Sequence, residues 1–284
     1  MKEMRIAILP NEQKDDGLVH TRKLLALLGG RAQAFVPEEL SQSLGARPLS
    51  REVLPSLHLA VTLGGDGTMI SRARMLLGWQ IPLLGVNLGR LGYLAQVEPQ
   101  AMQEAVEHIL SGDYSVERRI LLEGHVCGPD GPDDGKAFTA FNEALIHRST
   151  ASKLLRIRVD LNGAYFERFL SDGVLVATPT GSTAYNLSAG GPYVQPLAKN
   201  LVVTAVCPHS VAARSIVTAQ GDSVQLRVEP DEAPEEGHAP LLVVDGAKLC
   251  PLAPGESVFM QQSSQYLEIA RLPGQEPPQK KLFQ

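Results

Sequence analysis

The sequence feature that most constrains the fold is a glycine-rich turn between two apolar segments, HLAVTLGGDGT at residues 58–68. The apolar run before the turn, Leu59–Leu63, is of strand length and predicts a buried strand. Beyond the turn, residues 68–77 carry a helical stripe made of Ile70, Ala73, Leu76 and Leu77, and Gly78 ends it. A strand that leads through a tight turn into a helix is the unit from which parallel α/β sheets are built.

The turn carries the first functional signal, because three glycines surround one acid, Asp66. Glycines let the backbone approach a phosphate closely, and the free amides of a helix N-terminus favour negative charge. A carboxylate at that place repels phosphate unless it binds a cation or accepts a proton, which favours phosphoryl transfer. The alternative is a turn in which Asp66 only caps the helix. The turn resembles a signature shared by NAD kinases, diacylglycerol-type lipid kinases and phosphofructokinases.

The rest of the first 113 residues predicts one α/β domain. Expected elements are an opening strand at 5–9, a helix from Leu18 to Leu28, a less regular segment at 37–56, a second strand within 81–94 and a helix at 99–110. Alternating strands and helices indicate a doubly wound, Rossmann-like parallel sheet. Such sheets bind ligands beyond the carboxyl ends of their strands, where the loop with Asn87, Gly89 and Gly92 also lies.

From residue 114 the pattern changes to short strands without helical stripes. Apolar residues alternate at 155–161 and 224–228, and Asn162-Gly163 is a strong hairpin signal. We therefore expect a larger β-sandwich-like domain over 114–270, with exposed loops at 129–135 and 230–240 and a tail at 271–284.

Two polar segments interrupt this β pattern. The first is FNEALIHR at 141–148, whose Asn142 and Glu143 could be ordinary strand-edge residues. The second is TPTGSTAYNLSAGGP at 178–192, which is rich in hydroxyls and glycines and holds one aromatic, Tyr185. Hydroxyls and amides can bind a base edge or a phosphate, and an aromatic ring can stack on a planar one. A purely structural loop is the alternative, but so many polar groups would then need many partners.

Composition excludes several classes of function. The net charge of −5 predicts neither a nucleic-acid surface nor a basic membrane patch, and no apolar run reaches the length of a membrane helix. The three cysteines lack CxxC spacing, which predicts reduced, mostly buried thiols in a cytoplasmic protein. Cys and His residues also lack zinc-site spacing, so no protein-bound metal is expected.

Taken together, six segments resemble the NAD kinase family (ATP- or polyphosphate-dependent) in kind and order: 64–68, 85–94, 142–143, 172–173, 178–192 and 208–214. The resemblance spans roughly residues 5 to 270. It implies a site in a cleft between the two domains and phosphorylation of the adenosine ribose 2′-hydroxyl of NAD to give NADP. It further implies ATP or polyphosphate as donor, a donor-bound divalent metal, with Mg²⁺ expected, and a homo-oligomer, either a dimer or a tetramer.

The resemblance also assigns roles to single residues. Asp66 matches the catalytic acid, expected as general base, with Gly67 beside it at the ribose and pyrophosphate. Asn142 and Glu143 match the pair that holds ribose hydroxyls, and Asp172 matches the carboxylate facing nicotinamide. The remaining binding positions are Lys153, Thr183, Ala184, Tyr185, Asn186, Leu187 and Ser188. Two departures from the family pattern are Leu170, where many relatives have a basic residue, and Ala247, where glutamine is common.

Two other functions remain open at this point. A lipid kinase of the diacylglycerol kinase type shares the glycine turn and a β-rich second half. However, the loop at 178–192 suits a nucleotide better than an acyl chain, and no segment suits a membrane surface. A non-catalytic NAD(P)-binding sensor would keep the fold without the chemistry, and the intact Asp66 argues against it.

Overall fold

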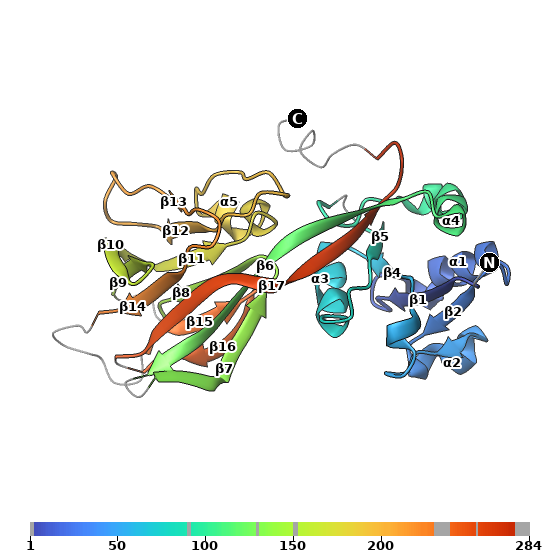
Figure 1. The fold of residues 1–284 in the computed structure, drawn as a ribbon, viewed down its shortest axis with the longest axis horizontal. Coiled ribbons are helices and arrows are strands. Elements are labelled where there is room, and N and C mark those ends of the chain that lie inside the picture. Colours follow the sequence, from blue (N-terminus) through green and yellow to red (C-terminus); the bar gives the residue numbers. More distant parts are fainter. Residues whose placement is uncertain are drawn as a thin grey trace. The chain divides into compact units, whose positions relative to one another are not determined.

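The structure, a computed structural model, describes residues 3–89, 92–128, 131–149, 153–229, 239–253 and 255–275, with the side chains of 132–135 left aside. The chain forms two compact units. The first consists of Met1–Arg118 together with Leu267–Gln284, and the second is Arg119–Tyr266. Two long strands, β6 (Ser115–Gly128) and β17 (Ser257–Arg271), pair with each other and carry the chain into the second unit and back (Figure 1).

The first unit is built on a parallel sheet, as predicted. Its strands are β1 (Arg5–Pro10), β2 (Gln33–Val36), β3 (Arg47–Pro48), β4 (Leu59–Gly64) and β5 (Leu83–Asn87). They lie in the order β5-β4-β1-β2-β3, and the last residues of β17 pair with β5. The chain therefore proceeds outward from β1 to β3 and then restarts on the other side of β1 with β4. The carboxyl ends of β1 and β4 form the topological switch point at which such sheets bind ligands.

Four helices cover this sheet: α1 (Val19–Leu28), α2 (Glu38–Leu44), α3 (Asp66–Met75) and α4 (Met102–Ser111). Three short 3₁₀ turns accompany them, η1 (Asp16–Leu18), η2 (Leu54–Ser56) and η3 (Pro99–Ala101). α1 and α4 bury their apolar stripes in one cluster with side chains of β1 and β4. Each fully buried Leu or Ile contributes about 1.5–3 kcal/mol to folding.

Two sequence predictions for this unit need correction. The segment 37–56 was expected to be irregular, yet it contains α2 and β3. α2 has only seven residues and one buried side chain, Leu40, so it shows almost no periodicity. The helix expected at 68–77 begins earlier, at Asp66, because the glycine turn itself supplies its first turn.

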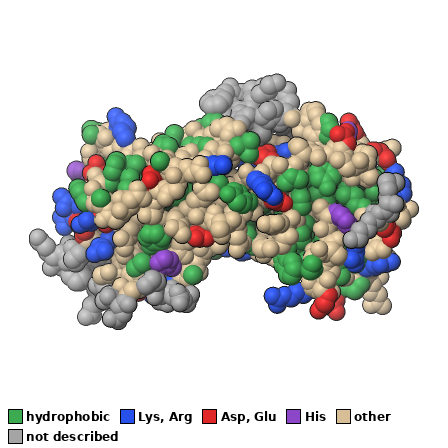
Figure 2. Space-filling model, in the orientation of Figure 1, with side chains coloured by type: hydrophobic (Ala, Val, Ile, Leu, Met, Phe, Trp, Pro, Cys, Tyr) green, Lys and Arg blue, Asp and Glu red, His purple; other side chains and the backbone are tan. Residues whose placement is uncertain are grey.

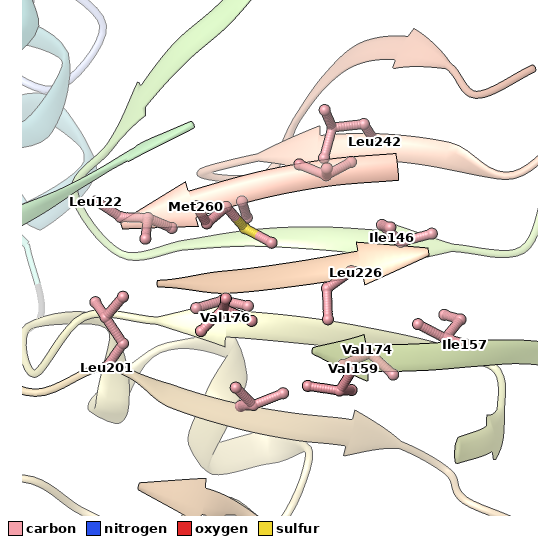
Figure 3. Packing of buried hydrophobic residues seen from close by; sticks show 14 of the residues in the cluster. Leu122, Ile146, Ile157, Val159, Val174, Val176, Leu201, Leu226, Leu242 and Met260 are labelled. Atoms are coloured by element: carbon pink, nitrogen blue, oxygen red, sulfur yellow. The ribbon is translucent and has the colours of Figure 1, made fainter. Parts of the chain in front are cut away.

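The second unit is a β-sandwich, as predicted. Its further strands are β7 (Gly131–Ala140), β8 (Glu143–His147), β9 (Leu155–Leu161), β10 (Ala164–Ser171), β11 (Gly173–Ala177), β12 (Val202–Val206), β13 (Ile216–Val217), β14 (Val224–Val228), β15 (Leu241–Val244) and β16 (Ala247–Pro251). One layer holds β10-β9-β14-β17 with β6 and β7, and the other holds β13-β12-β11-β8-β15-β16. The layers bury their facing side chains in one cluster, with Ile146 and Val174 from one layer and Val159 and Leu226 from the other (Figure 3).

Of the turns predicted for this unit, the hairpin turn at Asn162 and Gly163 is confirmed. Asn162 and Gly163 have φ values of 51° and 78° and join β9 to β10, as a two-residue hairpin turn requires. The loop expected at 129–135 is shorter than predicted, because β7 begins at Gly131. Most of the loop expected at 230–240 and residues 276–284 of the expected tail lie outside the described residues.

The surface charges, the helices and the cysteines can be compared with the predictions made from composition. On the face seen in Figure 2, basic and acidic side chains are interspersed. None of the helices described here has the length and hydropathy needed to cross a membrane. Cys127, Cys207 and Cys250 are free thiols, but Cys207 is exposed at the end of β12, contrary to the expectation of mostly buried cysteines.

Candidate functional site

The glycine turn lies at the switch point of the first unit, where β4 leads directly into α3. A side chain at Gly64 would overlap Thr68, and this close contact explains why glycine is required there. Thr68 Oγ1 accepts a hydrogen bond of 2.9 Å from Asn11 Nδ2, and Asn11 N donates to Leu63 O at 2.9 Å. The residue after β1 thus ties the two switch-point strands together beside the N-terminus of α3.

The carboxylate of Asp66 is held by the loop that follows β5. Oδ2 accepts a hydrogen bond from Tyr93 N at 2.7 Å, and Oδ1 accepts from Leu94 N and Ala95 N, each at 3.0 Å. A Cβ on Gly92 would overlap this carboxylate. The two glycine loops predicted from sequence therefore meet at Asp66, with Arg90 and Leu91 outside the described residues. Asp66 is neither a free acid nor a simple helix cap, because its partners lie in a different loop.

Lys14 is a basic residue at this site that sequence reasoning missed. Its ammonium group lies beside the glycine turn, 3.1 Å from the position that a Cβ on Gly65 would occupy. The side chain is exposed and comes from the segment after β1. A cation beside free helix amides adds to their attraction for phosphate. In the sequence, Lys14 follows the first predicted strand by a few residues. This position indicates a functional role only when the strand order is known, because β1 then lies next to β4.

In the second unit, Asn142 lies in the bend between β7 and β8, and Glu143 is the first residue of β8. The carboxylate of Asp245, at the tip of the β15–β16 hairpin, accepts hydrogen bonds from the backbone amides of Phe141, Asn142 and Glu143 at 2.7–3.2 Å. On the other side, Thr178 Oγ1 donates to Phe141 O at 2.6 Å and Thr178 N donates to Asn142 O at 2.8 Å. Asp245 was not among the predicted site residues.

Glu143 has an unusual environment for an acid. Its side chain is only 7% exposed, and Oε2 has no hydrogen-bond partner among the described residues. Burial, and then the negative charge of Asp245, raise the pKa of Glu143 to about 7, although the backbone amide of Tyr185 opposes the shift. A buried acceptor that the protein leaves unpaired is what a ligand hydroxyl could satisfy.

The polar loop 178–192 returns over the outer face of the second layer. It contains the 3₁₀ turn η4 (Gly181–Thr183) and the short helix α5 (Tyr185–Ser188). Asn186 is fully buried beneath it: Nδ2 donates to Ser182 O and Pro192 O, and Oδ1 accepts from Thr204 Oγ1 at 2.8 Å. The carboxamide of Asn186 therefore holds the loop in place and has little left to offer a ligand. Thr180 Oγ1, which sequence reasoning also missed, is buried with no partner among the described residues.

The phenol of Tyr185 is influenced by charged groups of several neighbouring segments. Burial raises the pKa of its phenol, and the charges of Cys207, Asp172 and Glu143 add to the effect. Asp172 precedes β11 and forms an ion pair with Arg148, with Oδ1 and Nη2 2.9 Å apart. Both side chains of that pair are about four-fifths buried. Glu143, the first residue of β8, and Asp172, directly before β11, lie at opposite ends of this strand pair, and the charges of both act on the Tyr185 phenol.

The other predicted positions are more peripheral. Thr183 Oγ1 donates to Thr180 O at 3.3 Å, and Ala184 is half-buried. Leu187, Ser188 and Lys153 are exposed, and the residues directly before Lys153 are not described. The two departures from the family pattern, Leu170 and Ala247, are also exposed. Within the described part of the chain, no group of three or more His, Cys, Asp or Glu side chains could hold a metal ion.

These features define a two-unit α/β plus β protein with a phosphate-type turn in one unit and a polar, aromatic loop in the other. Residues 46–114 match the ATP-NAD kinase N-terminal domain, and residues 141–272 match the ATP-NAD kinase C-terminal domain. The chain is 33% identical to the NAD kinase of Lachnoclostridium phytofermentans over 95% of its own length and 94% of the relative's. It is 34% identical to that of Syntrophotalea carbinolica over 96% and 94%.

Solved structures agree with this. The yeast NADH kinase in complex with NADH superposes with a TM-score of 0.81 at 25% identity, covering 94% of this chain and 83% of that one. The fold is also shared with an NAD kinase from Archaeoglobus fulgidus in complex with ATP, with a TM-score of 0.72 at 24% identity over 99% and 97%. The chain belongs to the NAD kinase family.

Proposed function

We propose that this chain is an NAD kinase that transfers a phosphoryl group from ATP to the 2′-hydroxyl of the adenosine ribose of NAD, giving NADP. The observation that carries the proposal is the Asp66 carboxylate, which is fixed by three backbone amides at the glycine turn of a switch point. Family membership over nearly the whole chain supplies the substrate class. A lipid substrate has no comparable support in either unit.

Asp66 acts as the general base. A carboxylate has about four acceptor sites, and three are used by the amides of Tyr93, Leu94 and Ala95, so one remains for the substrate hydroxyl. Phosphoryl transfer proceeds through a loose transition state that needs in-line placement more than strong deprotonation. A rigidly held carboxylate can orient the hydroxyl and accept its proton late, while the bond between oxygen and phosphorus forms. Gly67, beside it, offers an unobstructed surface to ribose and pyrophosphate.

The donor brings its own metal. No described cluster of carboxylates could hold Mg²⁺ near the turn, whereas Mg²⁺ commonly binds through substrate phosphates with only one or two protein ligands. The metal therefore belongs to the donor complex, which is MgATP in this proposal, with polyphosphate as the alternative donor. Lys14 and the amides of the glycine turn are the groups of the first unit that offset the donor's negative charge.

The second unit holds NAD. Glu143 and Asn142 bind ribose hydroxyls, for which the unpaired Oε2 of Glu143 is the available acceptor. Asp172 faces the nicotinamide portion, and Tyr185, 38% exposed, offers a ring for stacking. Thr183, Ala184, Leu187 and Ser188 belong to the same loop, and the exposed Lys153 completes the proposed set of binding residues. We further propose a cytoplasmic homo-oligomer, with residues 1–113 and 114–270 as its functional domains and 271–284 as a tail.

Purified protein incubated with NAD, Mg²⁺ and a panel of donors tests this function. NADP formation with ATP or polyphosphate supports it, and each donor's rate identifies the one used. Thermal shifts with NAD, NADP, ATP and a phospholipid vesicle should show stabilisation by the nucleotides alone. Stabilisation by NAD without NADP formation from any donor would instead identify a non-catalytic sensor. Turnover of a diacylglycerol in the vesicle would identify a lipid kinase.

A further inference from the structure

Asp245 lies in a hairpin turn, but its carboxylate binds a distant segment of the chain. Asp245 and Gly246 have φ values of 47° and 78° and form the two-residue turn between β15 and β16. Such a turn needs left-handed backbone, which Asn, Asp and Gly tolerate best. Turn geometry alone would leave the carboxylate free to face water. Instead it points at a bend about 100 residues earlier in the chain.

The bend at Phe141 and Asn142 separates β7 from β8, so its backbone amides lie outside the regular strands. Asp245 accepts from Phe141 N at 2.9 and 3.1 Å, from Asn142 N at 2.7 Å and from Glu143 N at 3.2 Å. Asp245 N in turn donates to Glu143 O at 3.0 Å. Successive backbone amides that converge on one anion form a rigid, charge-assisted arrangement.

The loop 178–192 fixes the bend from its opposite side. Thr178 bonds the carbonyl oxygens of Phe141 and Asn142, and a Cβ on Gly181 would overlap the backbone of Asn142. Both the N–H and the C=O groups of the bend are thereby engaged. Asn142 in the bend and Glu143 directly after it are the two residues whose side chains the substrate is proposed to meet, so their backbone has little freedom to adjust.

We infer that Asp245 is a positioning residue of the kinase reaction: its carboxylate fixes the backbone from which Asn142 and Glu143 reach the substrate ribose. The inference rests on the proposed function, since it needs NAD to bind at these two side chains. The role of Asp245 is indirect, because it acts through the bend and is not assigned a contact with the substrate. Its loss should therefore weaken NAD binding while leaving the donor site of the first unit as it was.

Asp245→Asn is the sharpest variant. The amide keeps one acceptor oxygen but turns an NH₂ group toward the backbone amides, so one or more of them loses its partner. Asp222→Asn is the matched control, because Asp222 accepts from Ala219 N at 2.7 Å and Asn162 Nδ2 at 2.8 Å at another turn of the same unit. Each variant removes a charged acceptor of backbone amides, but of the two native residues only Asp245 holds the bend.

The measurements are KM for NAD and for ATP, and the Kd of NAD without donor, in the full-length chain. Asp245→Asn should raise the KM and Kd of NAD about tenfold or more, which is the loss expected for about 1.4 kcal/mol. The KM of ATP should stay within about twofold, and Asp222→Asn should leave all three constants within about twofold of the unaltered chain. A general loss of folding would not separate the two substrates in this way.

Thr178→Val is a second variant, in case Asp245→Asn does not fold. It removes the hydroxyl that donates to Phe141 O and accepts from Gly181 N at 3.0 Å, but it keeps the side-chain volume. A smaller rise in the Kd of NAD with an unchanged KM of ATP is therefore expected. If Asp245→Asn folds and its Kd for NAD is within about twofold of the value for the unaltered chain, the inference is overturned but the proposed function stands. If Asp245→Asn does not fold, the same result for Thr178→Val overturns the inference. Failure of the unaltered chain itself to bind NAD overturns the proposed function as well.

Discussion

Gly92 lies directly against the carboxylate of Asp66, so closely that a Cβ at this position would overlap Oδ1. The three residues after Gly92 then bind that carboxylate through their backbone amides. The glycine is required because the backbone must approach an acid of another loop. The position of the proposed base is therefore set by residues 27–29 positions away in sequence.

Gly92→Ala should lower turnover without removing any catalytic group. The added methyl group must displace either the loop or the carboxylate, and small misplacements of a catalytic group cost up to about 100-fold in rate. We expect a fall in kcat of at least about tenfold, with the Kd of NAD nearly unchanged. Gly89→Ala is the control in the same loop, because a Cβ there meets only Asn87 Oδ1 at 4.0 Å. Steady-state kinetics that showed the same loss for both variants would refute the role of the close contact.

Lys14→Ala should act on the donor. Removing an ammonium group beside the glycine turn weakens attraction for the donor phosphates, so the KM of ATP should rise about three- to tenfold while that of NAD stays unchanged. Because Lys14 is exposed, the effect should shrink in high salt. Lys23→Ala, an exposed position on α1, serves as control. Kinetics at two ionic strengths check this, and an equal rise in both KM values would place Lys14 elsewhere in the mechanism.

Glu143→Gln should make stability less sensitive to pH. The pKa of Glu143 is raised by burial and by Asp245 to about 7, well above the value of an exposed glutamate. The stability that its proton contributes is fully present below about pH 4.5 and is lost as pH rises through about 7. Above pH 7 the parent chain must bury a charge that glutamine lacks. The melting temperature of Glu143→Gln minus that of the parent should therefore be larger at pH 8 than at pH 5.

The control for this measurement is Glu39→Gln, at an exposed position of α2. Its melting temperature should follow that of the parent at both pH values. A difference between Glu143→Gln and the parent that is the same at pH 5 and pH 8 would show that Glu143 keeps an ordinary pKa in the fold.

Asp172→Asn should discriminate between oxidised and reduced nicotinamide. The substitution removes the carboxylate charge that lies 2.9 Å from the mostly buried guanidinium of Arg148. The loss of the Asp172 negative charge disfavours the cationic ring of NAD⁺ more than the neutral ring of NADH. Titration calorimetry with NAD⁺, NADH and AMP should show the largest loss for NAD⁺ and almost none for AMP. Equal losses for all three ligands would mean that Asp172 acts on the fold or at the adenine end.

Local chemistry made part of this structure predictable. The strand, glycine turn and helix at 59–77 follow from periodicity, and Asn162-Gly163 forms its hairpin because few other dipeptides tolerate the required left-handed backbone. α2 could not be predicted, because a helix with a single buried residue has no detectable stripe. The path of β17 was equally hidden, because it is one continuous strand whose pairing partner changes from β14 to β5.

Some residues of the candidate site could be predicted from the sequence, and others could be found only in the structure. Asp66 and Tyr185 were predicted from their residue types within polar or glycine-rich motifs, whereas Glu143 and Asp172 were predicted only through the resemblance to NAD kinases. The residues that hold them in place, such as Asp245 and Gly92, act through contacts between distant segments. Asn186 lies within a predicted binding motif, but its side-chain amide forms its hydrogen bonds inside the protein.

The central claim is that Asp66 accepts the proton of the NAD 2′-hydroxyl. Asp66→Asn retains one acceptor oxygen but can neither take the proton nor serve all three amides of the loop. Single-turnover formation of NADP should be measured with saturating NAD and MgATP, for the parent, Asp66→Asn and Gly92→Ala, together with the Kd of NAD. We expect the rate of NADP formation to fall about 100-fold or more for Asp66→Asn, a larger loss than for Gly92→Ala, with NAD affinity little changed. NADP formation by Asp66→Asn within a few-fold of the parent rate would contradict it and leave Asp66 a structural residue of the turn.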